Sequence, residues 1–451
     1  MIQRSYRRAA CAMLLACSAL CAAPAAAQQP AGGAPEQVHF GTWGVDISTR
    51  DLSVKPGDDF QRYAAGKWLD THEIPADKSQ NGIGSELADR NQEQLRAIVM
   101  SAPKDSQLGA FYASYMDEAR LEQLDSAPLK PDLDKVDAIT TKAEFTRYMA
   151  DSLAGSGQTL FGVGVLPDFA HPDMNIGGVF SAGMGMPDRD YDLTDKYKTQ
   201  RDAYRAYMQR TLDMIGTPNA SAAADKVMAF ETEIAKLSWP QADLRDIDKL
   251  NNPMTLAELK AYAPQFDWAS YLSETRVVSP HMIVGDKTAI KALAELYVRT
   301  PLDTLKLWQR FKVADQASNY LSKRFVDSRF EYTKTLSGAK ELRPRWRRGI
   351  GEVDGRLGEL LGKTYVERYF PAESKTKMVE LVGNLKKAAA ERIQGNSWMS
   401  DATKKAALTK LAKMDVMVGY PDKFRDYSKL EIKPDDLIAH FLRSIDRKSV
   451  V

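Results

Sequence analysis

Apolar residues recur at three- and four-residue spacing along much of this chain, and that period constrains its fold more than any other feature. Such spacing places the apolar side chains on one face of an α-helix. The chain is therefore expected to be mainly α-helical, with helices over residues 142–153, 197–214, 221–237, 289–298, 302–321, 375–393 and 403–414.

Two short segments depart from the helical period. Residues 159–165 and 175–183 are rich in glycine and β-branched residues, with Pro167-Asp168 and His171-Pro172 between them. This pattern predicts a small β-hairpin within the helical body. Farther along, Ser400 and Asp401 stand where the N-cap of the last predicted helix belongs.

The first 27 residues have the pattern of a secretory signal peptide. Arg4, Arg7 and Arg8 precede an apolar run over residues 9–23, and three alanines at 25–27 supply a small-residue cleavage site. The run is shorter than the roughly 20 apolar residues that a membrane span needs. We therefore expect an exported, periplasmic or cell-envelope protein whose mature chain has no transmembrane span, with residues 28–50 as a flexible Gly/Pro-rich leader.

A lipoprotein is the alternative outcome of export. Leu14-Leu15-Ala16-Cys17 resembles a lipoprotein box, which would leave a lipid anchor at Cys17. The other cysteines, Cys11 and Cys21, lie in the same segment. The mature chain is thus expected to hold no disulfide, thiolate metal site or cysteine nucleophile.

Charge argues against nucleic acid as a partner. The net charge is +2, and subtracting the three N-terminal arginines leaves 2 − 3 = −1 for the rest. A near-neutral body lacks the basic surface that phosphates or an anionic membrane attract. The basic run 343–348 is flanked by Glu341, Glu352 and Asp354 and is interpreted as a salt-bridge cluster or a solvated helix face.

No group of residues in the sequence predicts a catalytic site. A hydrolytic zinc site needs imidazoles or carboxylates around one ion, with a position open for water. The string His72-Glu73-Ile74-Pro75-Ala76 begins like the His-Glu-x-x-His helix but ends in Ala76. The remaining histidines, His39, His171, His281 and His440, stand alone. We assign no catalytic and no metal-binding residue, and substrate-binding residues stay unknown.

Other candidate motifs favour structural roles. Gly162-Val163-Gly164 lacks the third glycine of a dinucleotide-binding turn. Three carboxylate pairs are interpreted as helix caps or solvated faces rather than acid/base dyads: they are Asp58-Asp59, Asp188 with Asp190, and Asp435-Asp436. The aromatic residues Phe60, Tyr63 and Trp68 are expected in the core.

A series of short strings resembles the neprilysin family of zinc metallopeptidases, in the family's order. The strings are 54–60, Gly66-Lys67-Trp68-Leu69, Ile74-Pro75-Ala76-Asp77, Gly185-Met186-Pro187-Asp188-Arg189-Asp190-Tyr191, Leu244-Arg245-Asp246 with Asn252-Pro253-Met254-Thr255, Pro344-Arg345-Trp346, Lys363-Thr364-Tyr365-Val366, Trp398-Met399, Thr403-Lys404-Lys405-Ala406 and Gly419-Tyr420-Pro421. The resemblance covers about residues 51–430. It departs from the family at Leu250-Asn251, where a tyrosine is usual, and at Ala64-Ala65, where animal members have a cysteine.

The resemblance implies a large helical N-terminal peptidase domain over 51–430, which encloses a cavity together with a thermolysin-like catalytic domain. In the family, zinc is bound by the two histidines of a His-Glu-x-x-His helix and a later glutamate. Zinc is expected for the full-length enzyme and none for this fragment, and peptides are the expected substrates. Residues 431–451 are expected to begin the connection to a missing catalytic domain.

Three hypotheses remain open. The chain is the cavity-forming part of a periplasmic zinc endopeptidase and is inactive alone; or it is a non-catalytic peptide- or partner-binding relative; or it is an unrelated helical protein with chance matches. An apolar helix face at 437–445 has no later sequence to pack on, which favours truncation or a frameshift. If a missing half normally covers the inner face of the helical shell, the chain exposes apolar surface, which predicts poor solubility or self-association.

Overall fold

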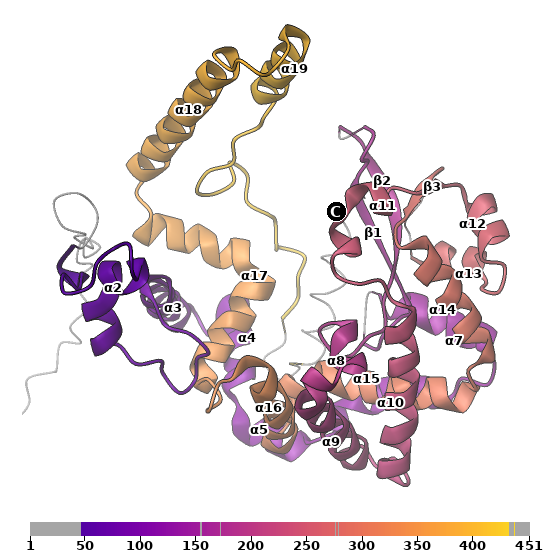
Figure 1. Ribbon diagram of the computed structural model, residues 1–451. Coiled ribbons are helices and arrows are strands. Elements are labelled where there is room, and N and C mark those ends of the chain that lie inside the picture. The colour runs from indigo at the N-terminus through magenta and orange to yellow at the C-terminus, as the bar shows by residue number, and fades with distance from the viewer. Residues whose placement is uncertain are drawn as a thin grey trace, which may run out of the picture. The chain divides into compact units, whose positions relative to one another are not determined.

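The computed structural model describes residues 47–432 and residue 437, except residues 154, 155, 172, 276 and 278. The signal peptide, Cys17, His39, His440 and most of the predicted C-terminal helix lie outside the described residues. The described chain is mostly helical (Figure 1). It forms two compact units, Met1–His72 and Glu73–Val451. The predicted domain over 51–430 includes parts of both, and its limits stay a prediction.

The first unit is built around one helix, α2 (Phe60–Thr71). Asp59 caps it by accepting a hydrogen bond from the Arg62 amide at 2.8 Å. Gly66 is buried, and a Cβ there would lie 2.5 Å from the Cβ of Asp51. The expectation that the aromatic stripe forms core is wrong for Phe60, whose side chain is 69% exposed. Phe60 is the first residue of α2 and the helix buries only Gly66, so the stripe has no core to enter.

The second unit contains the remaining elements. Its longer helices are α3 (Ile83–Ser101), α4 (Gln107–Met116), α7 (Lys142–Asp151), α9 (Lys198–Met214), α10 (Ala220–Leu237), α14 (Lys287–Arg299), α15 (Leu302–Ala317), α16 (Lys323–Ser337), α17 (Arg345–Tyr369), α18 (Ala372–Gln394) and α19 (Asp401–Ala412). Shorter helices are α5 (Glu118–Leu124), α6 (Lys130–Asp137), α8 (Arg189–Leu193), α11 (Ile247–Leu250), α12 (Leu256–Tyr262) and α13 (Trp268–Glu274). All seven predicted helices are present, with ends displaced by at most a few residues.

The larger hydrophobic core of this unit lies among α7, α9, α10, α14, α15 and α16. Helix α9 packs against α10 on one side and α16 on another, and α15 packs against both α9 and α10. Aromatic side chains fill the contact: Tyr207 and Phe311 are fully buried with ring centroids 5.8 Å apart. Such packing requires each helix to present an apolar face to its neighbours, which is what the three- and four-residue spacing of apolar residues predicts.

The predicted hairpin is present but belongs to a larger sheet. Strands β1 (Phe161–Pro167) and β2 (Asn175–Ser181) pair antiparallel, with Gly164 opposite Gly178. Strand β4 (Met282–Val284) runs parallel to β2, and β3 (Pro253–Met254) pairs with β4, giving the order β1-β2-β4-β3. Two- and three-residue strands show no period of their own, so the sequence did not reveal them.

A second hydrophobic core joins α3, α4 and α17. Ile98 on α3, Phe111 on α4 and Val353 on α17 are almost completely buried there. Gly349 lies so close to α4 that a Cβ would meet the rings of Tyr112 and Tyr115 at 3.0 Å. Because Gly349 has no side chain, α17 can approach α4 this closely.

Candidate functional site

The three described histidines stand in different local settings. The ring of His72 stacks on Trp68 with centroids 4.5 Å apart at the end of α2. His171 lies in the turn between β1 and β2, and His281 precedes β4; both are exposed. Across residues 47–432, with the gaps stated above, no three side chains of the His, Cys, Asp or Glu type are grouped so that they could hold a metal ion.

The basic run 343–348 binds acids and carbonyls from other helices. Arg347 lies 2.6 Å from the carboxylate of Asp89 on α3. Arg345 donates 2.9 Å to the carbonyl of Tyr115 and places its guanidinium over that ring at 4.8 Å. The run is thus a salt-bridge cluster, as predicted, but its acidic partners come from α3 and α5 rather than from the flanking acids.

Gly185, the first residue of the string 185–191, lies directly on a buried ion pair. The ammonium of Lys312 on α15 is 2.8 Å from the carboxylate of Glu231 on α10, and the side chains are 3% and 0% exposed. Tyr204 donates to the same carboxylate at 2.9 Å, and the Trp308 indole donates to it at 3.0 Å. Burial, followed by the charge of Glu231, raises the pKa of Tyr204 well above its ordinary value, so it stays a donor.

The backbone of Gly185 covers this ion pair from the side of the loop before α8. A Cβ at Gly185 would lie 1.9 Å from the Tyr204 hydroxyl and 2.5 Å from the Lys312 ammonium. Two residues of the same string anchor the loop: Asp188 caps α8, and Arg189 donates 2.5 Å to the carbonyl of Ser238. The string therefore builds a loop that seals a buried charge pair.

This cluster is a structural site rather than a reactive one. The Glu231 carboxylate pairs with Lys312 and accepts hydrogen bonds from Tyr204 and Trp308, and the pair is shielded from solvent. Sequence reasoning missed both charged residues. The available signal was a charged residue on an apolar helix face: Glu231 follows Val227 by four residues, and Lys312 follows Trp308 by four.

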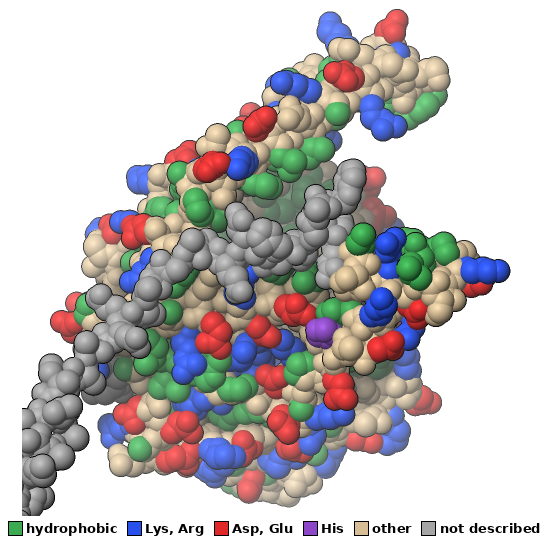
Figure 2. Space-filling model, turned by 90° about the vertical axis from the view of Figure 1, so that its left-hand side faces the viewer, with side chains coloured by type: hydrophobic (Ala, Val, Ile, Leu, Met, Phe, Trp, Pro, Cys, Tyr) green, Lys and Arg blue, Asp and Glu red, His purple; other side chains and the backbone are tan. Residues whose placement is uncertain are grey.

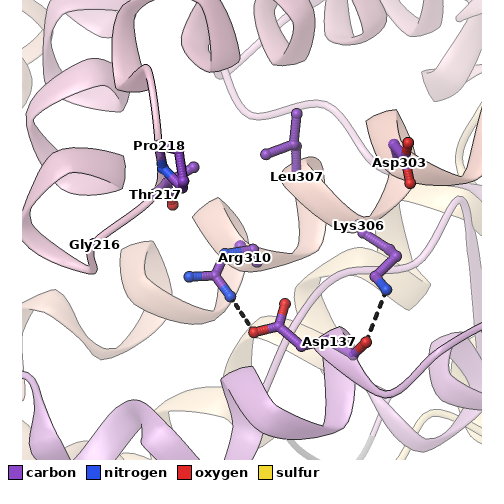
Figure 3. A pocket seen from close by; sticks show the side chains of 8 residues that line it. All are labelled: Asp137, Gly216, Thr217, Pro218, Asp303, Lys306, Leu307 and Arg310. Atoms are coloured by element: carbon purple, nitrogen blue, oxygen red, sulfur yellow. Dashed lines mark hydrogen bonds and ion pairs between the residues drawn. The ribbon is translucent and has the colours of Figure 1, made fainter.

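A surface hollow of 490 Å³ lies between α6, the loop before α10, and α15 (Figure 3). Arg310 pairs with the Asp137 carboxylate at 2.5 Å, and Lys306 donates to the Asp137 carbonyl at 2.8 Å. Figure 3 shows both cations directed at Asp137 rather than at an unfilled space. These cations tie α15 to the end of α6, so they do not offer charge to a ligand.

The helices α18 and α19, with residues up to 417, form what we call the α18–α19 arm (residues 372–417). No residue of either helix is buried. Met378, Leu381 and Leu385 are spaced along one face of α18 and are 44%, 51% and 62% exposed. Hydrophobic side chains lie along the arm at the top of Figure 2. We call these three residues the α18 stripe.

The arm carries further exposed apolar side chains. Trp398, between the helices, is 77% exposed, and Met417 is 97% exposed. The two helices pack on each other, and Lys386 on α18 donates to the Met414 carbonyl at 2.9 Å. Several exposed large apolar side chains on one helix pair are typical of an interaction surface.

No helix in the described part of the chain is long and apolar enough to cross a membrane.

Comparison with known proteins identifies the family. The model of peptidase family M13 matches residues 56–421. Human endothelin-converting enzyme 1 is 27% identical over 423 residues, and the match covers 87% of this chain and 54% of that enzyme. The chain belongs to peptidase family M13, the neprilysin family of metallopeptidases.

Solved structures show the same fold. The zinc metalloprotease Zmp1 of Mycobacterium tuberculosis, in complex with an inhibitor, matches with a TM-score of 0.84 at 30% identity, over 90% of this chain and 64% of Zmp1. PepO from Lactobacillus rhamnosis matches with a TM-score of 0.76 at 21% identity, over 87% of this chain and 65% of PepO. The predicted resemblance and the mainly helical fold class are confirmed. The chain spans between about half and two thirds of the length of these relatives.

Proposed function

We propose that this chain is the helical, cavity-forming portion of an exported zinc metallopeptidase that cleaves peptides, and that these 451 residues do not hydrolyse peptides by themselves. Family membership supports the class of reaction. One observation carries the second part: the 451 residues contain no His-Glu-x-x-His string, which supplies two zinc ligands and the water-activating glutamate in such peptidases.

The residues present do not fit the zinc that the family implies. A catalytic zinc takes three protein ligands and a water. Separate loops hold His72, His171 and His281. Among the described residues, none of these histidines belongs to a group of three side chains that could bind a metal ion. We therefore derive no catalytic step through zinc for this chain.

The α18–α19 arm is proposed as the surface that packs on the catalytic portion. The relatives are longer than the stretch that this chain matches, and the whole arm lies within the matched residues 56–421. The α18 stripe is apolar and uncovered in the described chain. Covering it would remove apolar area from water, at about 25 cal/mol for each Å².

Export is part of the proposal. The arginines at 4, 7 and 8, the apolar run to residue 23 and the alanines at 25–27 support a cleaved signal peptide. A lipid anchor at Cys17 is the alternative, and mass spectrometry of the mature N-terminus from the native host distinguishes the two.

Metal analysis of the purified 451-residue protein tests the proposal. We expect substoichiometric zinc after dialysis against a zinc buffer, because the described residues contain no group of three donors that could hold a metal ion. One tightly held zinc for each chain would contradict it. A catalytically complete M13 peptidase, prepared in parallel, is the positive control.

A non-catalytic peptide- or partner-binding protein is the second candidate, and the uncovered α18–α19 arm is the observation that favours it. The DNA beyond codon 451 discriminates between the two. A His-Glu-x-x-His string encoded there in any frame favours the peptidase portion. A stop codon followed by a separate gene favours the binding protein.

A further inference from the structure

Asp192 is a buried carboxyl group with no hydrogen-bond donor. It lies on α8, directly after the string 185–191, and is 6% exposed. Among the described residues neither of its side-chain oxygens has a hydrogen-bond partner. An ionised carboxylate in this state would be costly, because both desolvated oxygens would lack the donors that water gave them.

The nearby cations are already engaged. Arg201 on α9 donates to three backbone carbonyls, those of Tyr191, Asp192 and Thr194, at 3.0, 3.2 and 3.0 Å. Lys312 on α15 pairs with Glu231 at 2.8 Å. The Glu231 carboxylate on α10 adds a like charge. Tyr332 on α16, also buried, has a hydroxyl group without a partner in the described chain.

From this geometry we infer that Asp192 is a proton-binding site: the folded chain holds it as a neutral carboxylic acid, and loss of that proton loosens the segment 185–194. This site is independent of the proposed peptidase role. A neutral carboxyl group needs no counter-ion, and it relieves the repulsion from Glu231.

The charge environment supports the same conclusion. Burial, and then the charge of Glu231, raises the pKa of Asp192 to about 7, while Arg201 and Lys312 act in the opposite direction. On the Asp192 element itself, Asp190 is exposed, and Arg189 is bonded to the Ser238 carbonyl. Tyr204 and Tyr332 carry raised pKa values and stay neutral in this range.

The direction of the pH effect follows from linkage. Unfolded Asp192 loses its proton near pH 4, whereas the folded chain keeps the proton until about pH 7. Between these values the folded state binds more protons than the unfolded state, so its stability falls as pH rises. Above pH 7 both states are ionised and the effect is constant.

Equilibrium unfolding of wild type and Asp192→Asn in urea, from pH 5 to pH 8, tests the inference. The amide mimics the neutral acid and cannot ionise. From pH 5 to pH 8 the unfolding equilibrium constant of wild type, relative to the variant, should rise by up to about 100-fold. Asp190→Asn, the exposed neighbour on the same helix, should keep the wild-type pH profile.

A constant ratio between wild type and Asp192→Asn across this pH range would overturn the inference. Should the variant fail to fold, carbon NMR of aspartate-labelled wild-type protein gives the second measurement. One aspartate carboxyl group titrating near neutral pH is expected. All aspartates titrating below pH 5 would also overturn it.

Discussion

Among the described glycines, Gly185 is the one where an added Cβ would come nearest to another atom, 1.9 Å from the Tyr204 hydroxyl oxygen. Its backbone rests on the Glu231–Lys312 pair, and a Cβ would fall 2.4 Å from the Glu231 carboxylate. A buried ion pair is not by itself a large source of stability, but disturbing one partner leaves an uncompensated charge in a low-dielectric interior.

We predict that Gly185→Ala lowers the free energy of unfolding by about 3 kcal/mol, since overpacking and displacement of the ion pair act together. Urea denaturation followed by circular dichroism measures this change. Gly383→Ala is the matched control: it lies in exposed α18 with no atom within 4 Å of the added carbon. The control should be neutral or slightly stabilising, because alanine favours helix more than glycine. Equal losses in the two variants would contradict the role of Gly185.

At the residue scale the sequence predicted caps better than buried charges. Ser400 is the N-cap of α19 as expected, since its hydroxyl accepts from the Thr403 amide. Caps are local in sequence, and a four-residue pattern is enough to find them. The Glu231–Lys312 pair joins residues far apart in the chain, so only the tertiary fold brings them together. The same holds for Asp192, because its helix α8 packs on α9 and α10.

Among the longer helices of the second unit, α18 and α19 differ from the others because none of their residues is buried. The sequence predicted α18 at 375–393, and it spans Ala372–Gln394. The three- and four-residue spacing of its apolar residues predicted the helix. That spacing does not reveal which partner the apolar face contacts. Likewise the β-hairpin was predicted from glycine and β-branched residues, whereas β3 and β4 form only because the sheet aligns them.

We predict that the α18 stripe drives self-association of the purified chain. Leu381→Asp with Leu385→Asp should lower the weight-average mass in sedimentation equilibrium and reduce binding of a hydrophobic dye, because the charges remove the exposed apolar face. Lys387→Asp with Lys377→Asp, also exposed on α18, gives the matched control and should leave both readings near wild type. A wild-type chain that is monomeric and binds no dye would contradict this prediction.

For the whole molecule, the sequence predicted the family from the order of many short strings and not from any catalytic or metal-binding residue. The strings hold structural positions: Gly185 seals an ion pair, and Arg345 binds the Tyr115 carbonyl. Such positions identify a scaffold, because each depends on contacts that one fold provides. They carry no information on which peptides a complete enzyme would cleave.

The most direct test of the central proposal is a peptidase assay on the purified 451-residue protein with a quenched fluorescent oligopeptide and added zinc, with and without a chelator. We predict no chelator-sensitive cleavage above that of a mock purification, since the 451 residues contain no His-Glu-x-x-His string to bind zinc and activate water. Chelator-sensitive hydrolysis that co-elutes with the 451-residue chain would contradict the proposal.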